Sequence, residues 1–337
     1  MKNLLSALTK KAGTTNNDYL QMKKDTLAFS LFDFCKKRAD KVEIYGQESL
    51  DEQGEILPFI EQAAFVTHYL QLKDSNISIP YRDKAEALLN LWYEFVVGQN
   101  IKQKIQDNHV AESPAALQQY LFPDLFQAPF QAPHNPKFTF IDLFAGIGGF
   151  RMALQNLGGE CVFSSEWDEQ ARKTYYANYG DVPFGDITKE TVKNKIPQGF
   201  DILCAGFPCQ AFSLAGKRLG FEETRGTLFF DVAEILQRYQ PKAFFLENVK
   251  GLVIHDKGRT FKTILKALDE VGYVVPDPQI VNAMYFGVPQ HRERIYIVGF
   301  RKDLGISKED FTYPEQKEVT KKWIDVREEN PVPAKYY

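Results

Sequence analysis

Five short runs of β-type residues, separated by helical stretches, constrain the fold more than any other feature of this sequence. The runs are Phe138–Leu143, Cys161–Ser165, Asp201–Ala205, Ala243–Glu247 and Ile295–Phe300. Helical patterns such as Gly149–Leu157 and Thr227–Tyr239 lie between them, and Pro241 stops the second. Alternation of this kind predicts an α/β fold with a parallel sheet and helices on both faces. Ligands bind such sheets beyond the carboxyl ends of the strands, where functional residues are therefore expected.

The N-terminal third has a different pattern of apolar residues. Three segments carry apolar residues in a mainly helical pattern: Tyr19–Lys37, Phe59–Leu72 and Tyr81–Val97. Prolines then interrupt any long helix at positions Pro114, Pro123, Pro129, Pro133 and Pro136. We expect three parts: a helical domain at 1–110, a proline-rich linker at 111–137 and an α/β domain at 138–337. Several roles stay open for the helical domain, among them contacting another part of the protein and covering the sheet.

Composition narrows the class of protein. The chain has 44% hydrophobic and 25% charged residues, which is typical of a folded soluble protein. Its longest apolar runs, such as Ala243–Leu246, are too short to cross a bilayer. Four cysteines (Cys35, Cys161, Cys204 and Cys209) lack the spacing of a metal site or a disulfide framework. We therefore expect a cytoplasmic protein with reduced thiols and neither a metal nor a membrane partner.

A glycine-rich turn follows the first strand. The chain passes from Asp142 through Phe144 to three glycines at Gly146, Gly148 and Gly149. Glycines let the backbone approach a ligand closely and open the following helix. The spacing differs from the G-x-G-x-x-G pattern of dinucleotide folds, so a pyrophosphate is not specifically implied. Taken alone, a purely structural turn explains these glycines equally well.

Acidic residues stand near the ends of the next two strand-like segments. Glu166 lies roughly 20 positions past the glycines, where a carboxylate suits paired ribose hydroxyls. Trp167 is suited to lie against a flat adenine, and Asp186 to accept a hydrogen bond from an exocyclic amine. In isolation, a surface carboxylate and a half-buried indole are equally good interpretations. Together and in strand order, these residues indicate an adenosine-bearing ligand.

The third and fourth strands lead into reactive side chains. The third breaks into Gly206-Phe207-Pro208-Cys209-Gln210, which places a thiol at the strand exit. A free cysteine is strongly nucleophilic although only a few per cent thiolate at neutral pH. Burial as filler is the commoner role of a lone cysteine, and we expect it for Cys204. Glu247 follows an apolar run, where an unpaired acid is costly to bury. A surface loop carboxylate is the alternative interpretation.

In chain order, six segments resemble successive motifs of the DNA cytosine-5 methyltransferase family: Asp142–Phe150, Glu166-Trp167, Asp186-Ile187, Gly206–Gln210, Glu247–Val249 and Gln290–Arg294. The resemblance covers about Phe138 to Arg301, and its Phe-Pro-Cys-Gln and Glu-Asn-Val elements are highly specific in combination. It implies a Rossmann-like methyltransferase sheet, S-adenosylmethionine as cofactor and duplex DNA as partner. Methylation of a flipped cytosine, in a restriction-modification or DNA-marking system, is the implied function.

The resemblance also implies roles for individual residues. Cys209 is expected to attack C6 of the cytosine, and Glu247 to contact N3 and help it acquire a proton. Arg292 and Arg294 are expected to hold the base and support the thiolate site. Substrate contacts are expected from Ser213, Lys217 and Gln290. Cofactor contacts are expected from Asp142, Phe144, Gly146, Ile147, Gly148, Gly149, Glu166, Trp167, Asp186, Ile187, Phe207, Pro208 and Leu228.

One departure from the family pattern concerns target recognition. Family members continue past the last strand into a variable recognition region and two further motifs, whereas this sequence stops at Ala334–Tyr337. We expect either a truncated chain or a second polypeptide that supplies the rest.

Two alternatives to a DNA cytosine-5 methyltransferase stay open: a tRNA cytosine-5 methyltransferase and an inactive, partner-binding fragment. The tRNA branch usually has Pro-Pro-Cys where this chain has Phe207-Pro208-Cys209, which favours DNA.

Overall fold

The structure, a computed structural model, describes residues 59–69, 82–88, 128–208, 228–317 and 322–326. The chain divides into two compact units, Met1–Asp201 and Ile202–Tyr337, and each is described by itself. The expected helix at Tyr19–Lys37, most of the proline-rich segment and the residues Cys209, Ser213 and Lys217 lie outside the described ranges. The domain boundaries expected from the sequence stay a prediction.

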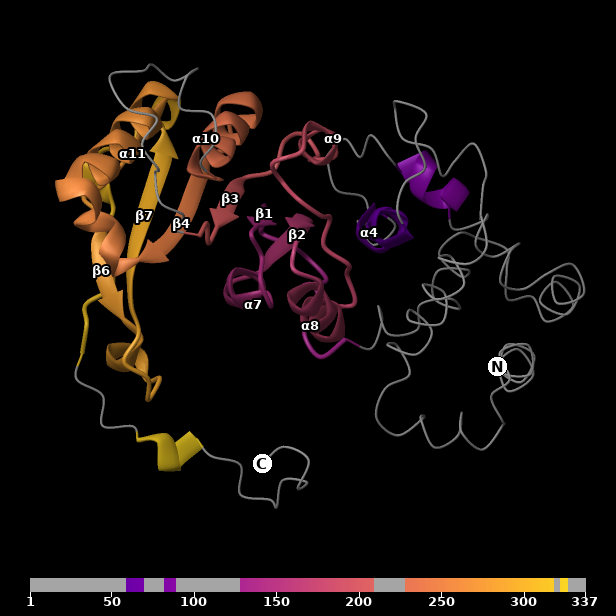
Figure 1. Cartoon of the computed structure of the whole chain (residues 1–337), viewed down its shortest axis with the longest axis horizontal. Helices are drawn as coiled ribbons and strands as arrows, with labels where there is room; N and C mark the ends of the chain where they lie inside the picture. The colour runs from indigo at the N-terminus through magenta and orange to yellow at the C-terminus, as the bar shows by residue number, and fades with distance from the viewer. Residues whose placement is uncertain (1–58, 70–81, 89–127, 209–227, 318–321, 327–337) are drawn as a thin grey trace, which may run out of the picture. The chain divides into compact units, whose positions relative to one another are not determined.

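The first unit contains two parallel strands with helices around them (Figure 1). Its elements are α4 (Phe59–Tyr69), β1 (Phe138–Leu143), α7 (Gly149–Asn156), β2 (Gly159–Ser165), α8 (Glu169–Tyr179) and α9 (Glu190–Lys193), and residues 82–88 are also helical. Aromatic and β-branched residues favour the extended conformation of β1, and its last four residues are buried. The expected strand at Phe138–Leu143 is thus confirmed, and the expected helix at Gly149–Leu157 ends one residue earlier.

Local sequence signals begin and end α8. The Asp168 carboxylate accepts a hydrogen bond from the Ala171 amide at 2.7 Å, as an N-terminal cap does. Gly180 ends the helix with a φ of 74°, a left-handed conformation that glycine adopts without strain. These two signals fix the length of α8 and place Tyr179 in its last turn.

The second unit is built around β7. Its elements are β3 (Ile202–Ala205), α10 (Leu228–Tyr239), β4 (Ala243–Val249), η3 (Lys250–Val253), η4 (His255–Gly258), α11 (Arg259–Glu270), β5 (Tyr273–Val274), β6 (Gln279–Asn282), η5 (Ala283–Phe286), β7 (Glu293–Arg301), η6 (Lys302–Leu304), η7 (Lys308–Asp310) and η8 (Trp323–Val326). β3 and β4 are parallel, whereas β7 is antiparallel to β4, β5 and β6. Strands alternating with helices confirm the α/β class.

The expectation of a wholly parallel sheet was wrong for the last strand. β7 runs antiparallel to β4, and the sequence also gave no sign of β5 and β6. The physical reason is the connection between β6 and β7, which is one short 3₁₀ turn and a few further residues. A parallel return needs a crossover of a dozen or more residues, so this short link makes β7 antiparallel to β6. β4 and β6 both run opposite to β7, so the strand direction reverses only at this link.

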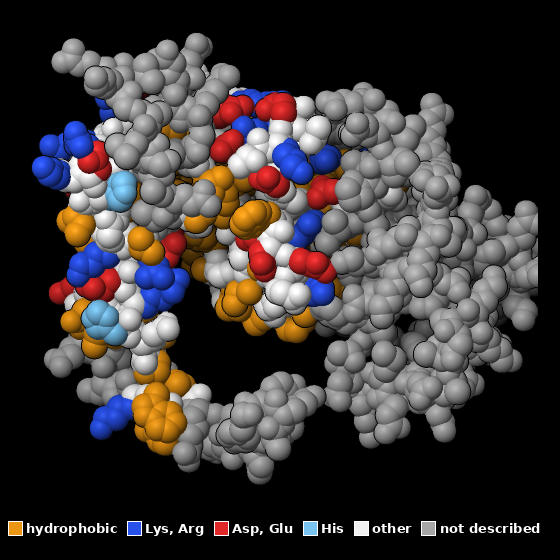
Figure 2. Space-filling model, in the orientation of Figure 1, with side chains coloured by type: hydrophobic (Ala, Val, Ile, Leu, Met, Phe, Trp, Pro, Cys, Tyr) orange, Lys and Arg blue, Asp and Glu red, His pale blue; other side chains and the backbone are white. Residues whose placement is uncertain are grey.

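Burial alternates along the elements of the second unit. In β4, Phe244 and Leu246 are buried while Phe245 and Glu247 are only partly covered, so the strand has one closed face. In α11, Thr260, Ile264, Ala267 and Leu268 are buried, at the spacing of one helix side. On the molecular face in Figure 2, Lys and Arg side chains intermix with Asp and Glu. Within the described ranges, no helix is long and apolar enough to cross a membrane.

Candidate active site

The glycine turn after β1 has an unusual backbone. Phe144, Gly146 and Gly148 have φ values of 53°, 56° and 90°, so the chain enters the left-handed region three times within five residues. Tyr179 of α8 donates a hydrogen bond to the Gly148 carbonyl at 2.5 Å. A Cβ at Gly148 would lie 2.2 Å from the Tyr179 ring. Glycine is therefore required at 148 by both conformation and space.

Glu166 ties this turn to the end of β2. One of its carboxylate oxygens accepts from the Gly146 amide and the other from the Asp168 amide, each at 2.8 Å. The side chain is almost fully buried, and charge-assisted bonds of this kind are the stronger ones. Glu166 thereby fixes the separation between the glycine turn and the chain beyond β2.

Four further predicted cofactor contacts differ in exposure. Ile147 and Trp167 present apolar side chains to solvent, with exposed fractions of 59% and 74%. Asp186 is partly exposed, and its Oδ1 accepts from the Thr188 amide at 3.0 Å and from its hydroxyl at 2.8 Å. The neighbouring Ile187 is buried. A planar apolar side chain and an oriented carboxylate are thus available to a ligand.

Asp142 is a buried carboxyl at the end of β1. Neither of its oxygens has a hydrogen-bond partner among the described residues. Burial raises the pKa of Asp142 to about 8, although the Arg151 guanidinium opposes this shift. Arg151 itself is fully buried and forms an ion pair with Asp181. A buried carboxyl with no partner, beside a glycine turn, suits a ligand that carries positive charge.

In the second unit, the chain leaving β3 is held by β4. Phe207 is buried with its ring centroid 5.7 Å from that of Phe229 in α10. The Asn248 side chain donates to the Phe207 carbonyl at 2.8 Å. Pro208 is exposed, and Cys209 follows it outside the described residues. Cys204 is fully buried within β3, and Leu228 begins α10.

Glu247 lies among the predicted arginines. Its Oε1 is 2.8 Å from Nε of Arg294 and 3.7 Å from Nη2 of Arg292. The antiparallel register pairs Glu247 with Tyr296, so Arg294, two residues earlier, lies on the same face of the sheet. Glu293 alternates to the other side and pairs with Lys250 at 2.9 Å. Strand alternation therefore sorts one charged run into two separate ion-pair groups.

Asn282 fixes the backbone before β7. Its Oδ1 accepts from the amides of Arg292 and Met284 at 3.1 and 3.2 Å. The Ala283 amide in turn donates to the Arg292 carbonyl at 3.0 Å. Gln290, a predicted substrate contact, is exposed on the turn between η5 and β7. Arg292 is thus placed by a buried side chain that the sequence did not single out.

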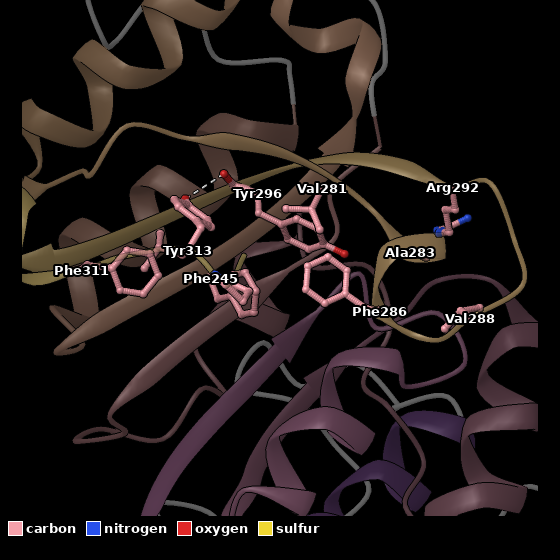
Figure 3. A pocket seen from close by; sticks show the side chains of 11 residues that line it. Phe245, Val281, Ala283, Phe286, Val288, Arg292, Tyr296, Phe311 and Tyr313 are labelled. Carbon is pink, nitrogen blue, oxygen red and sulfur yellow. Dashed lines mark hydrogen bonds between the residues drawn. The ribbon is translucent and has the colours of Figure 1, made fainter. Parts of the chain in front are cut away.

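Glu247, Arg292 and Arg294 form the Glu247 cluster. A cavity of about 350 Å³, lined in part by Arg292, lies beside it (Figure 3). Its lining is mainly apolar and comes from β4, β6, η5, the turn between η5 and β7, β7 itself and the segment after it: Phe245, Val281, Ala283, Phe286, Val288, Arg292, Tyr296, Val298, Phe311, Tyr313 and Pro314. The rings of Phe245 and Tyr296 have centroids 5.4 Å apart, and the Tyr313 hydroxyl donates to the Tyr296 carbonyl at 3.0 Å. Burial and the nearby Glu247 raise the pKa of Tyr296, although Arg292 and Arg294 oppose this.

Sequence reasoning missed Tyr296, Asn248 and Asn282. Tyr296 was detectable, because it follows Arg294 by two positions and strand alternation returns it to the same face. Asn248 belongs to the Glu247–Val249 motif, but the resemblance implies no role for it. Asn282 carried no signal, because its contacts depend on pairing between β6 and β7. As for metals, the described part of the chain has no group of three or more His, Cys, Asp or Glu side chains that could hold one.

Two Type II methyltransferases are similar to this chain in sequence. The Type II methyltransferase M.HpaII of Haemophilus parainfluenzae is 65% identical over 234 residues, which are 69% of this chain and 63% of that protein. M.HhaI of Haemophilus parahaemolyticus is 51% identical over 175 residues, 52% of this chain and 53% of that protein. This chain thus spans between half and two thirds of the length of these two relatives.

Among solved structures, a Spodoptera frugiperda DNMT2 mutant matches 58% of this chain and 61% of its own, with 22% identity and a TM-score of 0.43. The family model described as C-5 cytosine-specific DNA methylase matches residues 138–337, which is more than half of the chain. That range includes both the glycine turn after β1 and the Glu247 cluster. The chain therefore belongs to the C-5 cytosine-specific DNA methylase family.

Proposed function

We propose that this chain is the catalytic part of an enzyme that methylates C5 of a flipped-out cytosine in duplex DNA. The methyl group comes from S-adenosylmethionine, and Cys209 forms a covalent adduct with the base. Family membership and the likeness to M.HpaII support DNA methylation in a restriction-modification system. The observation that carries the proposal is Glu247, held 2.8 Å from Arg294 at the end of β4, beside the strand that leads to Cys209.

Cys209 and Glu247 would divide the first step between them. The Cys209 thiolate forms a bond to C6, and the electrons of the C5–C6 double bond move into the ring. N3 acquires a proton as C6 is attacked, and the Glu247 carboxyl assists by contacting N3. Such acid assistance is typically worth about 10²–10⁴ in rate. C5 is left as a nucleophile.

The second half of the reaction restores the base. C5 would take the methyl group that the cofactor supplies, with S-adenosylhomocysteine as the leaving group, and would then lose its proton to a base. The bond between Cys209 and C6 would break as the C5–C6 double bond forms again, which releases the thiolate, and N3 would return its proton to the Glu247 carboxylate. In the duplex, neighbouring bases cover both faces of the cytosine ring, so neither C6 nor C5 can react. The cytosine must therefore first leave the helix, at a cost of a few kcal/mol. Arg292 and Arg294 are the groups we expect to hold it.

The first unit fits S-adenosylmethionine, which supplies an electrophilic methyl group when bound. The exposed Trp167 ring suits adenine, and the partly exposed Asp186 suits its amino group. Each Glu166 oxygen accepts from one backbone amide, and its remaining lone pairs suit the ribose hydroxyls. Asp142, buried and without a partner among the described residues, suits the positive charge of the methionine portion.

Duplex DNA is the proposed substrate rather than tRNA. The sequence Phe207-Pro208-Cys209 differs from the Pro-Pro-Cys of the tRNA branch. The region that would choose the target sequence is proposed to come from outside the matched part, either as further sequence or as a second polypeptide. Base readout of this kind belongs to groove contacts rather than to the catalytic residues.

Methyl transfer tests the proposal directly. The chain is combined with the remaining portion of M.HpaII and given radiolabelled S-adenosylmethionine with duplex DNA or tRNA. We expect label in duplex DNA, and loss of turnover in Cys209→Ser because serine is a far weaker nucleophile. Duplex DNA containing 5-fluorocytosine should trap an adduct that peptide mapping places at Cys209.

Cys161→Ser is the matched control, because Cys161 is buried in β2 and is expected to be inert. It should transfer methyl groups at the wild-type rate. Undiminished turnover in Cys209→Ser, or an adduct on another cysteine, would refute the covalent mechanism. Label in tRNA and none in DNA would favour the related tRNA enzyme instead.

A further inference from the structure

We propose that helix α4 is a working part of the cofactor site, with Glu61 as a positioning residue for the Gly185-Asp186 connection. The inference rests on the proposed S-adenosylmethionine site, in which Glu166, Trp167 and Asp186 meet the adenosine portion. It assigns a role to one segment of the N-terminal third, for which the sequence left several roles open.

The first contact joins Glu61 to the chain just before Asp186. Oε1 of Glu61 accepts a hydrogen bond from the Gly185 amide at 2.8 Å. Arg172 and Lys195 approach the same carboxylate at 3.5 and 3.8 Å, and the side chain of Glu61 is only 12% exposed. A Cβ added to Gly185 would lie 2.6 Å from Oε1, so carboxylate and backbone are closely fitted.

The second contact joins α4 to β2, two residues before Glu166. Nε2 of His68 lies 2.9 Å from the Ser164 hydroxyl and 3.1 Å from the Ser164 amide. Nδ1 of His68 contacts the Ala64 carbonyl at 3.2 Å, which is consistent with a neutral ring that donates from Nδ1. The same helix also accepts from the Val182 amide through Thr67, at 2.9 Å. One helix therefore holds both segments that lead to the proposed adenosine contacts.

The two segments are also bonded to each other. The Ser165 hydroxyl donates to the Gly185 carbonyl at 2.7 Å, and the Glu166 amide donates to the Phe184 carbonyl at 2.8 Å. Phe184 is buried between α4 and β2, with its ring centroid 5.3 Å from that of Phe65 and 5.1 Å from that of Phe163. A shift of α4 would therefore move Phe184 and Gly185 together.

The connection needs this outside support because its pairing with β2 is short. A single parallel bridge, Ser165 to Phe184, joins them outside the named strands. Glu61 adds a charge-assisted hydrogen bond to the next amide along, and such a bond to a charged group is worth more than a neutral one. Because Asp186 follows Gly185 directly, the position of its carboxylate depends on α4.

The test compares three variants of the full chain. Glu61→Ala removes the acceptor, while Glu61→Gln keeps an oxygen that can accept from the Gly185 amide. Glu86→Ala is the matched control: Glu86 is also an ion-paired helical glutamate of the N-terminal third, but 38% exposed. Binding of S-adenosylhomocysteine is titrated to millimolar concentrations. Hydrogen exchange of the peptide that contains Gly185 is measured without ligand.

We expect Glu61→Ala to weaken the affinity for S-adenosylhomocysteine roughly tenfold, the loss of one hydrogen bond to a charged group. The Gly185 peptide should exchange faster in this variant. Glu61→Gln should restore protection and most of the affinity, and Glu86→Ala should match the wild type. A merely structural role for Glu61 predicts faster exchange throughout the first unit rather than at Gly185.

Three outcomes would overturn the proposal, and they separate its failure from that of the cofactor site. If Glu61→Ala has a wild-type circular dichroism spectrum and binds S-adenosylhomocysteine with wild-type affinity, the positioning role is wrong. Uniformly faster exchange in Glu61→Ala, without rescue by Glu61→Gln, overturns it as well. If the wild type itself binds neither S-adenosylhomocysteine nor S-adenosylmethionine, the cofactor assignment fails, and the positioning proposal fails with it.

Discussion

Glu247 lies between two arginines that differ in distance and exposure. Arg294 is 2.8 Å away with 22% of its side chain exposed, whereas Arg292 is 3.7 Å away and 49% exposed. Water screens the more exposed pair more strongly, and an exposed ion pair contributes little. Arg294 should therefore determine where the Glu247 carboxylate lies, while Arg292 remains available to a ligand.

A pair of conservative substitutions tests this difference. Arg294→Lys replaces a planar group that reaches Glu247 through Nε with a flexible point charge. Misplacing a catalytic group by about 1 Å can cost about 10² in rate, and we expect a loss of that order in kcat/KM. Arg292→Lys should cost less than about tenfold, because its pair with Glu247 is weak and the lysine keeps a positive charge that can still meet the base. Methyl-transfer kinetics of the reconstituted enzyme measure both, and equal losses would contradict the assignment.

At the residue scale, the sequence predicted which charged residues lie together but not the distances between them. Glu247, Arg292 and Arg294 were expected at one site from their motifs, and the structure places them together. Their order of distance depends on the register between β4 and β7, which no local pattern encodes. The burial of Asp142 is likewise a property of the packed unit, although the residue itself was a predicted contact.

Among the elements, α4 was predicted as a helix, but the contacts that it makes were not. The apolar stretch at Phe59–Leu72 indicated a helix, and the structure has one at Phe59–Tyr69. The contacts of Glu61 and His68 lie 124 and 96 residues further along the chain. Periodicity in a short window carries no information about partners at such a separation. The polar residues on the buried face of α4 therefore became meaningful only in the folded unit.

His68 makes the attachment of α4 sensitive to pH. Burial lowers its pKa to about 4, although the nearby Asp181 opposes this shift. Between pH 4 and 6.5 the unfolded state binds a proton that the folded state does not, so stability rises with pH across this window. At about 1.4 kcal/mol per pKa unit, acidification from above 6.5 to below 4 costs the fold about 3 kcal/mol.

Urea denaturation of wild type and His68→Gln between pH 4 and 7 measures this dependence. The variant should be less stable than the wild type at pH 7 and should lose less stability on acidification. His134→Gln is the control for loss of a histidine ring, because His134 is exposed and its replacement should leave the stability at pH 7 unchanged. Parallel pH profiles for His68→Gln and wild type would show that the His68 ring does not titrate as expected.

The strands of the second unit mark the limit of prediction for elements. Longer apolar runs at Ala243–Glu247 and Ile295–Phe300 were found, and the structure extends each of them. β5 has two residues and β6 has four, too few for a periodic pattern to stand out. Missing them also concealed the antiparallel pairing that builds the cavity beside Arg292.

At the level of the whole molecule, the proposed reaction is divided between the two units. The first carries the glycine turn, Glu166 and Asp186, and the second carries the Glu247 cluster and the strand that leads to Cys209. The family match at 138–337 extends across both. In the sequence, the expected cofactor motifs precede the expected catalytic motifs, but the division between the two units was not predicted. Packing within each unit then decided which motif residues are buried and which are exposed.

Overall charge leads to a last prediction about DNA affinity. The chain has 41 Lys and Arg against 44 Asp and Glu, a formal charge of −3, and the two signs intermix on the face in Figure 2. Non-specific affinity comes mainly from neutralised phosphates, so a chain without a basic excess should make few such contacts. We expect the chain alone to bind random duplex DNA no more tightly than about 10⁻⁶ M at physiological salt.

Fluorescence anisotropy between about 50 and 200 mM salt measures this affinity and the number of phosphate contacts. Each contact contributes about −0.9 to the slope of log K against log salt, so a few contacts should give a slope of about −2 to −3. Lys217→Ala should make the slope shallower by about 1 if this lysine meets a phosphate. Lys266→Ala is the control, since Lys266 is an exposed lysine paired with Glu270 at 3.4 Å on α11. Nanomolar binding with a steep slope would instead indicate a concentrated basic surface on this chain.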